Sequence, residues 1–187
     1  MGPNGGPELA AAGHDRAVGW VVAGVAGLLA LAVRWHLVGG FAGLRGYHGY
    51  DDGVYYSSAV AFVHGRMPYR DFLLLHPPGI MLALTPFAAL ARWTGDSTAL
   101  AAARLAFIVV GALNTVLVAR LARRWGIASA VVAGTLYAVS SAAAYAERLT
   151  LLEPLGTLTV LAAVSLLLRA RTSDSCLLYT SPSPRDS

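Results

Sequence analysis

Apolar residues gather in long runs along this chain, and short polar connections separate the runs. Four runs are about as long as the roughly 20 residues that a helix needs to cross a bilayer: residues 17–38, 97–119, 127–146 and 149–168. A fifth run, residues 79–91, has thirteen residues and contains Pro86, so its length is typical of an interfacial or re-entrant segment. The pattern predicts an all-α polytopic membrane protein with about four transmembrane helices.

The positions of arginine decide whether residues 79–91 are expected to cross the membrane. In multi-pass membrane proteins, Lys and Arg concentrate in the short cytoplasmic loops. If residues 79–91 crossed, the basic turn 120–126 would lie on the opposite side from Arg16; if they do not cross, that turn, Arg16 and the basic residues 169–171 share one side. We therefore expect residues 79–91 to stay at the outer face and the N-terminus to be cytoplasmic.

This topology divides the chain into spans and loops. Residues 1–16 are expected as a cytoplasmic tail without regular structure, and residues 39–96 as an extracytoplasmic loop with interfacial helices at 54–65 and 78–93. The remaining segments follow in order: first span 17–38, second span 97–119, cytoplasmic turn 120–126, third span 127–146, outer loop 147–153, fourth span 154–170 and tail 171–187.

Composition agrees with a membrane protein and excludes an ordinary soluble globule. Hydrophobic residues make up 56% of the 187 residues, 13% are charged, and the mean hydropathy is +0.58. All fourteen basic residues are Arg, which is typical of a GC-rich bacterial genome, so the expected location is a bacterial plasma membrane. Arg at membrane borders accounts for the pI of about 9.6, and we expect no nucleic-acid partner.

The last twelve residues, 176–187, differ from the rest of the chain. They hold its one Cys and two of its nine prolines, and they show no membrane periodicity. The segment "CLLYTSPSPRDS" resembles the conceptual translation of a transposase-type sequencing adapter, so it carries no information about the fold. We expect the authentic chain to stop near Asp174, as a truncated fragment that is inactive alone.

Four carboxylates fall on the outer side of this topology: Asp51, Asp52, Glu147 and Glu153. Glu153 lies about one turn inside an apolar helix, where an ionisable side chain is costly and marks a candidate functional site. The ordinary alternative is an interfacial Glu that pairs with Arg148 and caps the helix starting at Pro154.

The adjacent acids Asp51 and Asp52 lie among aromatic residues and glycines in "YHGYDDGVYY". An Asp just before a helix accepts backbone N–H bonds as an N-cap, which contributes about 1 kcal/mol, and one Asp is enough for that role. Two neighbouring carboxylates at a membrane surface are also suited to act as a general base with an orienting or metal-coordinating partner. The sequence leaves both interpretations open.

Three histidines of the outer segment, His48, His64 and His76, offer a possible metal site. Their spacing does not match a compact metal motif such as His-Glu-x-x-His. The sequence therefore predicts no definite cofactor and leaves a divalent metal as an alternative.

A transmembrane helix is followed in order by "DDGVYY", "HGRMPYRDF", the diproline of "LLLHPPGIML", the Arg-bearing "AAARLAF", the basic "RLARRWG" and "RLTLLEP". Over residues 17–170, this order resembles the N-terminal half of membrane-embedded GT-C glycosyltransferases. The likeness is strongest to the bacterial family that includes protein-mannosyltransferase-like and aminoarabinose-transferase-like enzymes. The resemblance implies a GT-C fold with interfacial helices at the outer face.

The resemblance also implies an activity: inverting transfer of a hexosyl or pentosyl group, in the cell envelope, from a polyprenyl-phosphate carrier to an acceptor hydroxyl. The implied partners are that lipid-linked sugar, the lipid bilayer, and a glycan, lipid or protein acceptor. Asp51 matches the first acid of the family's acidic pair, the implied catalytic base, and Asp52 would support it. Arg148 and Glu153 match the family's Arg-x-x-x-Leu-Asp/Glu pattern.

In such enzymes Arg side chains hold the departing phosphate, and the candidates for that role are Arg66, Arg70 and Arg104. Snorkelling alone is an alternative explanation for Arg104, which lies inside an apolar run. The residue before the diproline is commonly Lys in the aminoarabinose-transferase branch and is His76 here, a departure from the family's pattern.

A second class of function remains open, a membrane transporter or flippase subunit. In that interpretation Asp51, Arg104 and Glu153 line a polar pathway. A transporter brings such residues to the bilayer midplane between broken helices, whereas a transferase gathers them near the outer face. A non-catalytic scaffold is a third possibility, but it leaves Glu153 unexplained.

Overall fold

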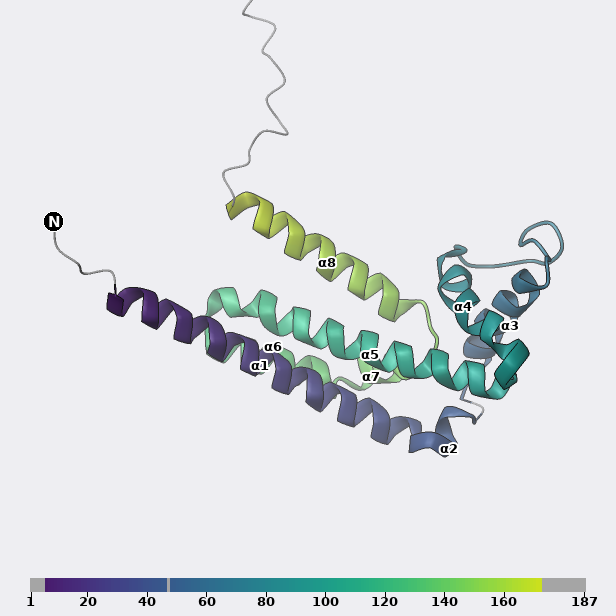
Figure 1. The fold of residues 1–187 in the computed structure, drawn as a ribbon, viewed down its shortest axis with the longest axis horizontal. Coiled ribbons are helices and arrows are strands. Elements are labelled where there is room, and N and C mark those ends of the chain that lie inside the picture. Colours follow the sequence, from purple (N-terminus) through teal and green to yellow (C-terminus); the bar gives the residue numbers. More distant parts are fainter. Residues whose placement is uncertain (1–5, 47, 173–187) are drawn as a thin grey trace, which may run out of the picture.

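The computed structural model describes residues 6–46 and 48–172, most of which lie in helices (Figure 1). Within these ranges the chain has no strand, and Pro68 and Phe72 form an isolated bridge. The prediction of an all-α fold is therefore confirmed for this part of the chain. The adapter-like segment 176–187 lies outside the described residues.

Three helices are long and apolar enough to cross a membrane: α1 (Gly6–Val38), α5 (Asp96–Ala122) and α8 (Glu153–Thr172). The expected spans 17–38, 97–119 and 154–170 lie within them. A fourth crossing is possible when α6 (Ile127–Val139) and α7 (Ser141–Glu147) are taken together as one bent pair. The described chain thus has three such helices, or four with the bent pair, and they indicate a membrane protein.

Helix α1 begins earlier than the sequence analysis expects. Residues 6–16, expected as a tail without regular structure, form the first turns of this helix. Pro7 suits the first turn of a helix, where its missing N–H group is not needed, and the alanines at 10–12 are the strongest helix formers. These local preferences extend the helix beyond its apolar stretch.

The stretch 127–146, expected as one span, is broken at Ser140. This residue has an extended ψ of 120°, and the axes of α6 and α7 differ by 60° on either side of it. The Ser140 hydroxyl accepts a hydrogen bond from the backbone N–H of Ala143 at 3.5 Å, so the side chain caps the start of α7. The break turns α7 and its terminal Glu147 away from the line of α6.

Three shorter helices lie together at one end of the long helices (Figure 1): α2 (Gly40–Leu44), α3 (Tyr50–Val63) and α4 (Gly79–Thr94). Helix α4 packs against both α3 and α5, and it is not among the candidate membrane spans in the described chain. An apolar core joins α3, α4 and α5 through Tyr55, Tyr56, Ala59, Ile80, Met81 and Phe107.

Helices α1, α5 and α6 pack side by side and form the main body of the bundle (Figure 1). Small residues allow this close approach. A Cβ atom added at Gly134 would lie 2.9 Å from the Cβ of Ala26 and 3.0 Å from that of Ala119, which is too close for ordinary contact. Glycine at this position therefore lets α6 contact both neighbouring helices.

The chain passes along the bundle in alternating directions. The start of α1, the 3₁₀ turn η1 (Arg123–Trp125) and the end of α8 lie at one end, which we call the arginine end (Figure 1). Helices α2, α3 and α4 and the connection between α7 and α8 lie toward the opposite end, which we call the acidic end. The acidic end is named for the four carboxylates of the sequence analysis, and it also carries arginines such as Arg66, Arg70 and Arg148.

Candidate functional site

A cavity of about 670 Å³ lies between the start of α3, the bend between α6 and α7, and the start of α8. All four outer carboxylates of the sequence analysis line it: Asp51, Asp52, Glu147 and Glu153. They come from α3 and from the consecutive helices α7 and α8, which lie far from α3 in the sequence. The fold thus gathers these acids at a single cavity of the acidic end.

A second cavity, of about 590 Å³, lies on the other side of α3, against the loop that leads to α4. Its walls are largely apolar, with Val54, Phe72 and Leu75, but Arg66 and His76 also line it. Asp51 and its neighbour Tyr50 line both cavities. Asp51 therefore stands where an apolar cavity with cationic or polar groups meets a cavity rich in carboxylates.

The Asp51 side chain is exposed and has no hydrogen-bond or ion-pair partner among the described residues. Its charge acts on the nearby phenol of Tyr55. Burial raises the pKa of Tyr55, and the negative charges of Asp51 and Glu153 raise that pKa further. Two carboxylates from different helices therefore act on one phenol, whose oxygen lies 3.3 Å from His76 Nδ1.

Asp52 has the opposite environment from Asp51. It is 1% exposed. Its Oδ2 accepts hydrogen bonds from the Arg104 guanidinium, whose Nε lies at 3.1 Å. Its Oδ1 accepts hydrogen bonds from Thr150 N at 2.9 Å and from Thr150 Oγ1 at 2.5 Å. Burial alone would raise the pKa of Asp52, but the bonds from Arg104 and Thr150 outweigh it and lower that pKa. Asp52 thus ties α3 to α5 and to the segment before α8.

The structure also rules out the helix-cap interpretation of this acidic pair. Helix α3 begins at Tyr50, after Gly49, and no side chain caps its start. Both aspartates lie inside the first turn, where negative charge favours the positive end of the helix dipole. The second carboxylate, which a cap would leave unexplained, is accounted for by the ion pair with Arg104.

Arg104 is engaged by groups other than a phosphate. It is 2% exposed, forms the ion pair with Asp52, and donates through Nη1 to the carbonyls of Leu44 at 2.5 Å and Gly46 at 2.8 Å. It lines neither of the two cavities. Neither snorkelling nor phosphate contact describes this side chain, which instead fixes the positions of α3 and the chain after α2.

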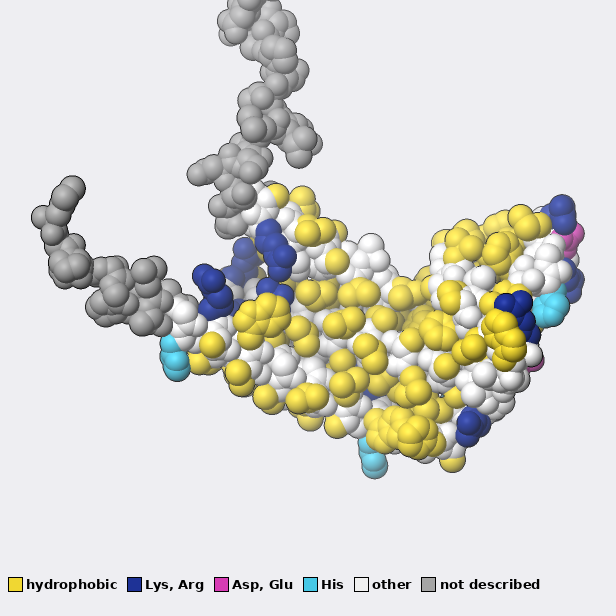
Figure 2. Space-filling model, in the orientation of Figure 1, with side chains coloured by type: hydrophobic (Ala, Val, Ile, Leu, Met, Phe, Trp, Pro, Cys, Tyr) yellow, Lys and Arg dark blue, Asp and Glu magenta, His cyan; other side chains and the backbone are white. Residues whose placement is uncertain are grey.

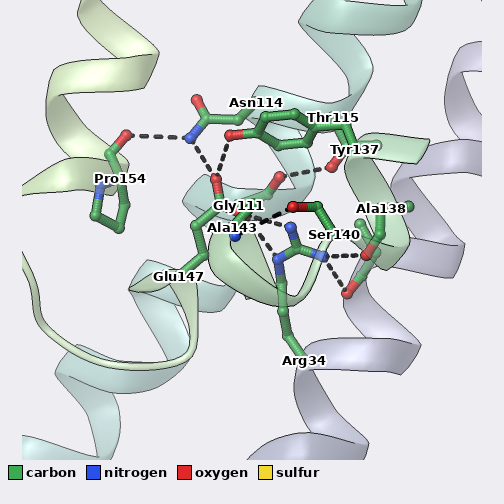
Figure 3. Close-up of polar contacts among 11 residues, drawn as sticks. Arg34, Gly111, Asn114, Thr115, Tyr137, Ala138, Ser140, Ala143, Glu147 and Pro154 are labelled. Carbon is green, nitrogen blue, oxygen red and sulfur yellow. Dashed lines mark hydrogen bonds and ion pairs between the residues drawn. The ribbon is translucent and has the colours of Figure 1, made fainter. Parts of the chain in front are cut away.

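Beneath the first cavity, Figure 3 shows a buried ion pair between Arg34 of α1 and Glu147 of α7. Arg34 is fully buried and donates through Nε to Glu147 Oε2 at 2.8 Å. Its Nη1 donates to the carbonyls of Ala30 at 3.1 Å and Ala138 at 3.0 Å. The Ala138 carbonyl lies at the end of α6, where the helix break leaves carbonyls without helical partners.

Two further side chains complete this network (Figure 3). The Nδ2 of Asn114 donates to Glu147 Oε1 at 2.8 Å and to the carbonyl of Pro154 at 3.1 Å, and the Tyr137 hydroxyl donates to Glu147 Oε1 at 2.8 Å. A Cβ at Gly111 would lie 2.6 Å from Glu147 Oε2, so glycine leaves the space that the carboxylate fills. The network connects five helices at the base of the cavity, α1, α5, α6, α7 and α8.

The other residues expected at the site lie in different places. Arg66 lines the second cavity and donates through Nη2 to the carbonyl of Asp71 at 3.2 Å. Arg70 is exposed, pairs with Asp71 at 2.8 Å, and lines neither cavity. The Asp71 carboxylate raises the pKa of Arg70. Of these two arginines, only Arg66 is placed to meet a ligand in the second cavity.

Arg148 and Glu153 do not pair with each other among the ion pairs of residues 6–46 and 48–172. Arg148 Nη1 donates to the carbonyl of Leu37 at 2.8 Å, and its guanidinium lies 5.1 Å from the ring centre of Tyr145. Glu153 is exposed at the first cavity, as the first residue of α8. The ordinary explanation of Glu153 as half of an interfacial ion pair with Arg148 is therefore wrong.

The three histidines are apart and bound to other groups. The ring of His48 contacts the carbonyl of Gly43, that of His64 contacts the carbonyl of Val60, and that of His76 contacts Tyr55. No group of three or more His, Cys, Asp or Glu residues in the described part of the chain is arranged to hold a metal ion. The structure gives the three-histidine alternative no support.

The site can be interpreted chemically from its own residues. Family models, curated proteins and solved structures gave no match to this chain. An exposed carboxylate at the junction of two cavities can accept a proton from a group in one while a second reactant occupies the other. The neighbouring Asp52 cannot do so readily, because its oxygens are occupied and its pKa is lowered.

Sequence reasoning did not identify Arg34, Asn114 or Thr150 as site residues. The signal for Arg34 was its charge within the apolar run 17–38, where a guanidinium requires a partner. Thr150 gave no signal, since a hydroxyl near the border of a span is common. Glu147, the partner of Arg34, lies 113 residues away in the chain, and Asp52, the partner of Thr150, lies 98 residues away.

Proposed function

We propose that this chain forms part of a GT-C-type glycosyltransferase that moves a sugar from a polyprenyl-phosphate donor to an acceptor hydroxyl at the outer face of a membrane. The observation that carries the proposal is that Asp51 lines both cavities of the acidic end. The order of sequence motifs adds independent support. A transfer reaction needs two adjoining substrate sites with a base between them, and two cavities that share one exposed carboxylate support this proposal.

The two cavities differ in a way that suits the two substrates. The second cavity combines apolar walls with Arg66 and His76, which matches a lipid chain that ends in a phosphate. The first cavity is lined by carboxylates and by tyrosines such as Tyr50 and Tyr145, groups that hydrogen-bond to the hydroxyls of an acceptor. We therefore assign the donor to the second cavity and the acceptor to the first.

In the proposed reaction, Asp51 takes the proton of the acceptor hydroxyl as its oxygen bonds to the anomeric carbon of the sugar. The bond from that carbon to the phosphate oxygen breaks, and the phosphate leaves with the electron pair. Arg66 stabilises the negative charge on the departing phosphate. Attack from the face opposite the phosphate inverts the anomeric centre, while Asp52, held by Arg104 and Thr150, positions the turn that carries Asp51.

Donor binding is tested with the 187-residue chain in nanodiscs and a polyprenyl-phosphate-linked sugar that carries a photoreactive prenyl chain. We expect crosslinks within residues 54–76 and about a tenfold loss of crosslinking in Arg66→Gln, because a charge-assisted phosphate contact is removed. Arg92→Gln is the matched control, since Arg92 lies on Trp93 outside both cavities. Equal crosslinking in the two variants would contradict the assignment of the donor cavity.

The role of Asp51 is tested separately from binding. In a full-length enzyme that contains this segment, Asp51→Asn should keep donor crosslinking but lower the rate of sugar release, to an acceptor or to water, by about 10²-fold or more, because the base is lost. Asp96→Asn is the control; that carboxylate accepts a hydrogen bond from the Tyr56 hydroxyl at 3.2 Å and lines neither cavity. Unchanged sugar release by Asp51→Asn would remove it as the base.

One observation favours the second class, a flippase or transporter. The break between α6 and α7, with the buried pair Arg34–Glu147 beside it, is the kind of discontinuous helix that lines transport sites. A flippase moves the lipid-linked sugar across the bilayer without breaking the bond between sugar and phosphate. Recovery of intact donor in the opposite leaflet, with no released sugar, would favour this class over the transferase.

A further inference from the structure

The arginine end of the bundle carries a cluster of guanidinium groups that the proposed function does not use. Figure 2 shows these basic side chains gathered near the start of α1 and the ends of α5 and α8. The cluster consists of Arg16, Arg120, Arg123, Arg124 and Arg169. It comes from three separate segments of the chain, so the fold, and not a local sequence run, assembles it.

A cavity of about 220 Å³ lies within this cluster, between α5 and α8. Arg120, Arg124 and Arg169 line it together with the Ser165 hydroxyl, and Leu117 and Leu168 are among the apolar residues of its wall. Cationic groups and a leucine wall therefore adjoin in one hollow. A phosphate that is attached to an acyl chain has the same two parts.

Contacts with tryptophan rings and with the backbone orient the arginines around this hollow. The Arg120 guanidinium lies 3.8 Å from the ring centre of Trp20, and that of Arg124 lies 5.4 Å from the ring centre of Trp125. Arg123 donates through Nη2 to the backbone carbonyl of Asp15 at 2.6 Å. Stacking leaves the N–H groups at the edge of a guanidinium able to donate to an anion.

The general preference of arginine for one membrane border explains why basic residues occur at this end. It does not explain why residues of α5 and α8 enclose a common cavity with an apolar wall. Basic pockets between transmembrane helices at such a border bind the head groups of anionic lipids. We propose that the cavity lined by Arg120, Arg124, Arg169 and Ser165 binds the phosphodiester head group of an anionic phospholipid, with the leucines against its acyl chain.

This site is independent of the proposed glycosyl transfer, since it lies at the opposite end of the bundle. The test uses the 187-residue chain in nanodiscs of phosphatidylcholine with a minor fraction of phosphatidylglycerol, followed by native mass spectrometry of the retained lipid. We expect phosphatidylglycerol to be retained at least about fivefold over its share of the nanodisc lipid. No enrichment over phosphatidylcholine would overturn the proposal.

The variant Arg124→Gln/Arg169→Gln removes two guanidiniums on exposed side chains, so we expect the far-UV circular dichroism of the wild type and loss of the phosphatidylglycerol preference. The matched control is Arg70→Gln/Arg92→Gln, which also removes two guanidiniums, both at the acidic end; Arg70 pairs with Asp71, and Arg92 lies 3.7 Å from the ring centre of Trp93. Equal loss of the phosphatidylglycerol preference in both variants would mean that the preference depends on overall charge alone, and it would overturn the proposal.

A third arm of the experiment separates a lipid from a soluble phosphate. Inorganic phosphate is added at the same concentration as the phosphatidylglycerol, and the retained lipid is measured again. We expect the lipid to remain bound, because the leucine wall contacts its acyl chain and offers nothing to free phosphate. Displacement of the lipid by inorganic phosphate would assign the cavity to a soluble anion and overturn the lipid proposal.

Discussion

At the scale of single residues, two adjacent aspartates have different environments because of the helix that carries them. Neighbouring side chains on a helix point about 100° apart, so Asp52 faces α5 while Asp51 faces the cavities. Asp52 finds Arg104 and Thr150 and is buried with its charge satisfied. Asp51 finds no described partner and remains available for chemistry.

The stability of the fold should depend on pH through Asp52. Its folded pKa lies below the ordinary value of 3.8, so its contribution is fully present above pH 3.8 and is lost as the pH falls through the lowered folded pKa. At neutral pH, Asp52→Asn should lower the free energy of unfolding by about 3–5 kcal/mol, because Arg104 is left buried without its counter-charge.

Thermal unfolding in detergent, followed by circular dichroism from neutral pH down to about pH 2, measures this contribution. The difference in stability between the wild type and Asp52→Asn should shrink toward the acid end of that range. Asp51→Asn is the matched control on the neighbouring residue, and its exposed side chain should change stability by no more than about 0.5 kcal/mol. A difference in stability between the wild type and Asp52→Asn that stays constant to the lowest pH would contradict the assigned environment of Asp52.

The sequence was sufficient to identify the outer carboxylates that line one cavity, but not the partners that they contact. Glu153 and the aspartate pair were found because charged side chains are costly near an apolar segment. The partner of Asp52 was within reach as well, since Arg104 also carries a charge inside an apolar run. Their pairing depends on how α3 lies against α5, which is a tertiary contact that no local pattern encodes.

At the scale of helices, the bend between α6 and α7 has the largest effect on the site. It directs Glu147 toward Arg34 and leaves the Ala138 carbonyl for the same guanidinium. Hydropathy predicted one continuous span here, because the residues on both sides of the break are apolar. The local signal was the pair of serines at 140–141, since Ser is favoured at the start of a helix.

The pair Arg34–Glu147 should hold this bend in place. Glu147→Gln should destabilise the chain by about 3–5 kcal/mol, because the fully buried Arg34 loses its counter-charge. The double variant Arg34→Met/Glu147→Met leaves no unpaired buried charge. Its loss of stability should therefore be smaller than the sum of the losses in the single variants Arg34→Met and Glu147→Met. Thermal unfolding of the four proteins in a double-mutant cycle measures the coupling, and strict additivity would contradict a direct interaction.

The long helices themselves could be predicted from the sequence with little error in their cores. Apolar runs of about 20 residues have few alternatives to a helix when they lie in a bilayer. Their ends were harder to place, as α1 shows by extending into residues 6–16. Residues 6–16 favour a helix although they are not part of the apolar run. A criterion based on hydropathy alone therefore places the start of α1 too late in the chain.

At the scale of the whole molecule, the bundle places its two charged cavities at opposite ends. The carboxylates that line the first cavity lie toward the acidic end. The arginine cluster lies at the other end, where Figure 2 shows basic side chains gathered. This separation follows from long helices that alternate in direction, with α4 remaining beside α3. A common site for the four carboxylates requires that the connections before α5 and before α8 face one side of the membrane and that the turn η1 faces the other.

Single cysteines test this arrangement most directly, in a chain whose own Cys176 is replaced by Ser. Cysteines are placed at Ser57, Ser97, Ala146 and Arg124 and labelled in sealed vesicles with a reagent that does not cross the membrane. We expect positions 57, 97 and 146 to be labelled from one side and position 124 from the other. Labelling of positions 57 and 97 from opposite sides would mean that α4 crosses the membrane, and it would contradict a common site for the four carboxylates.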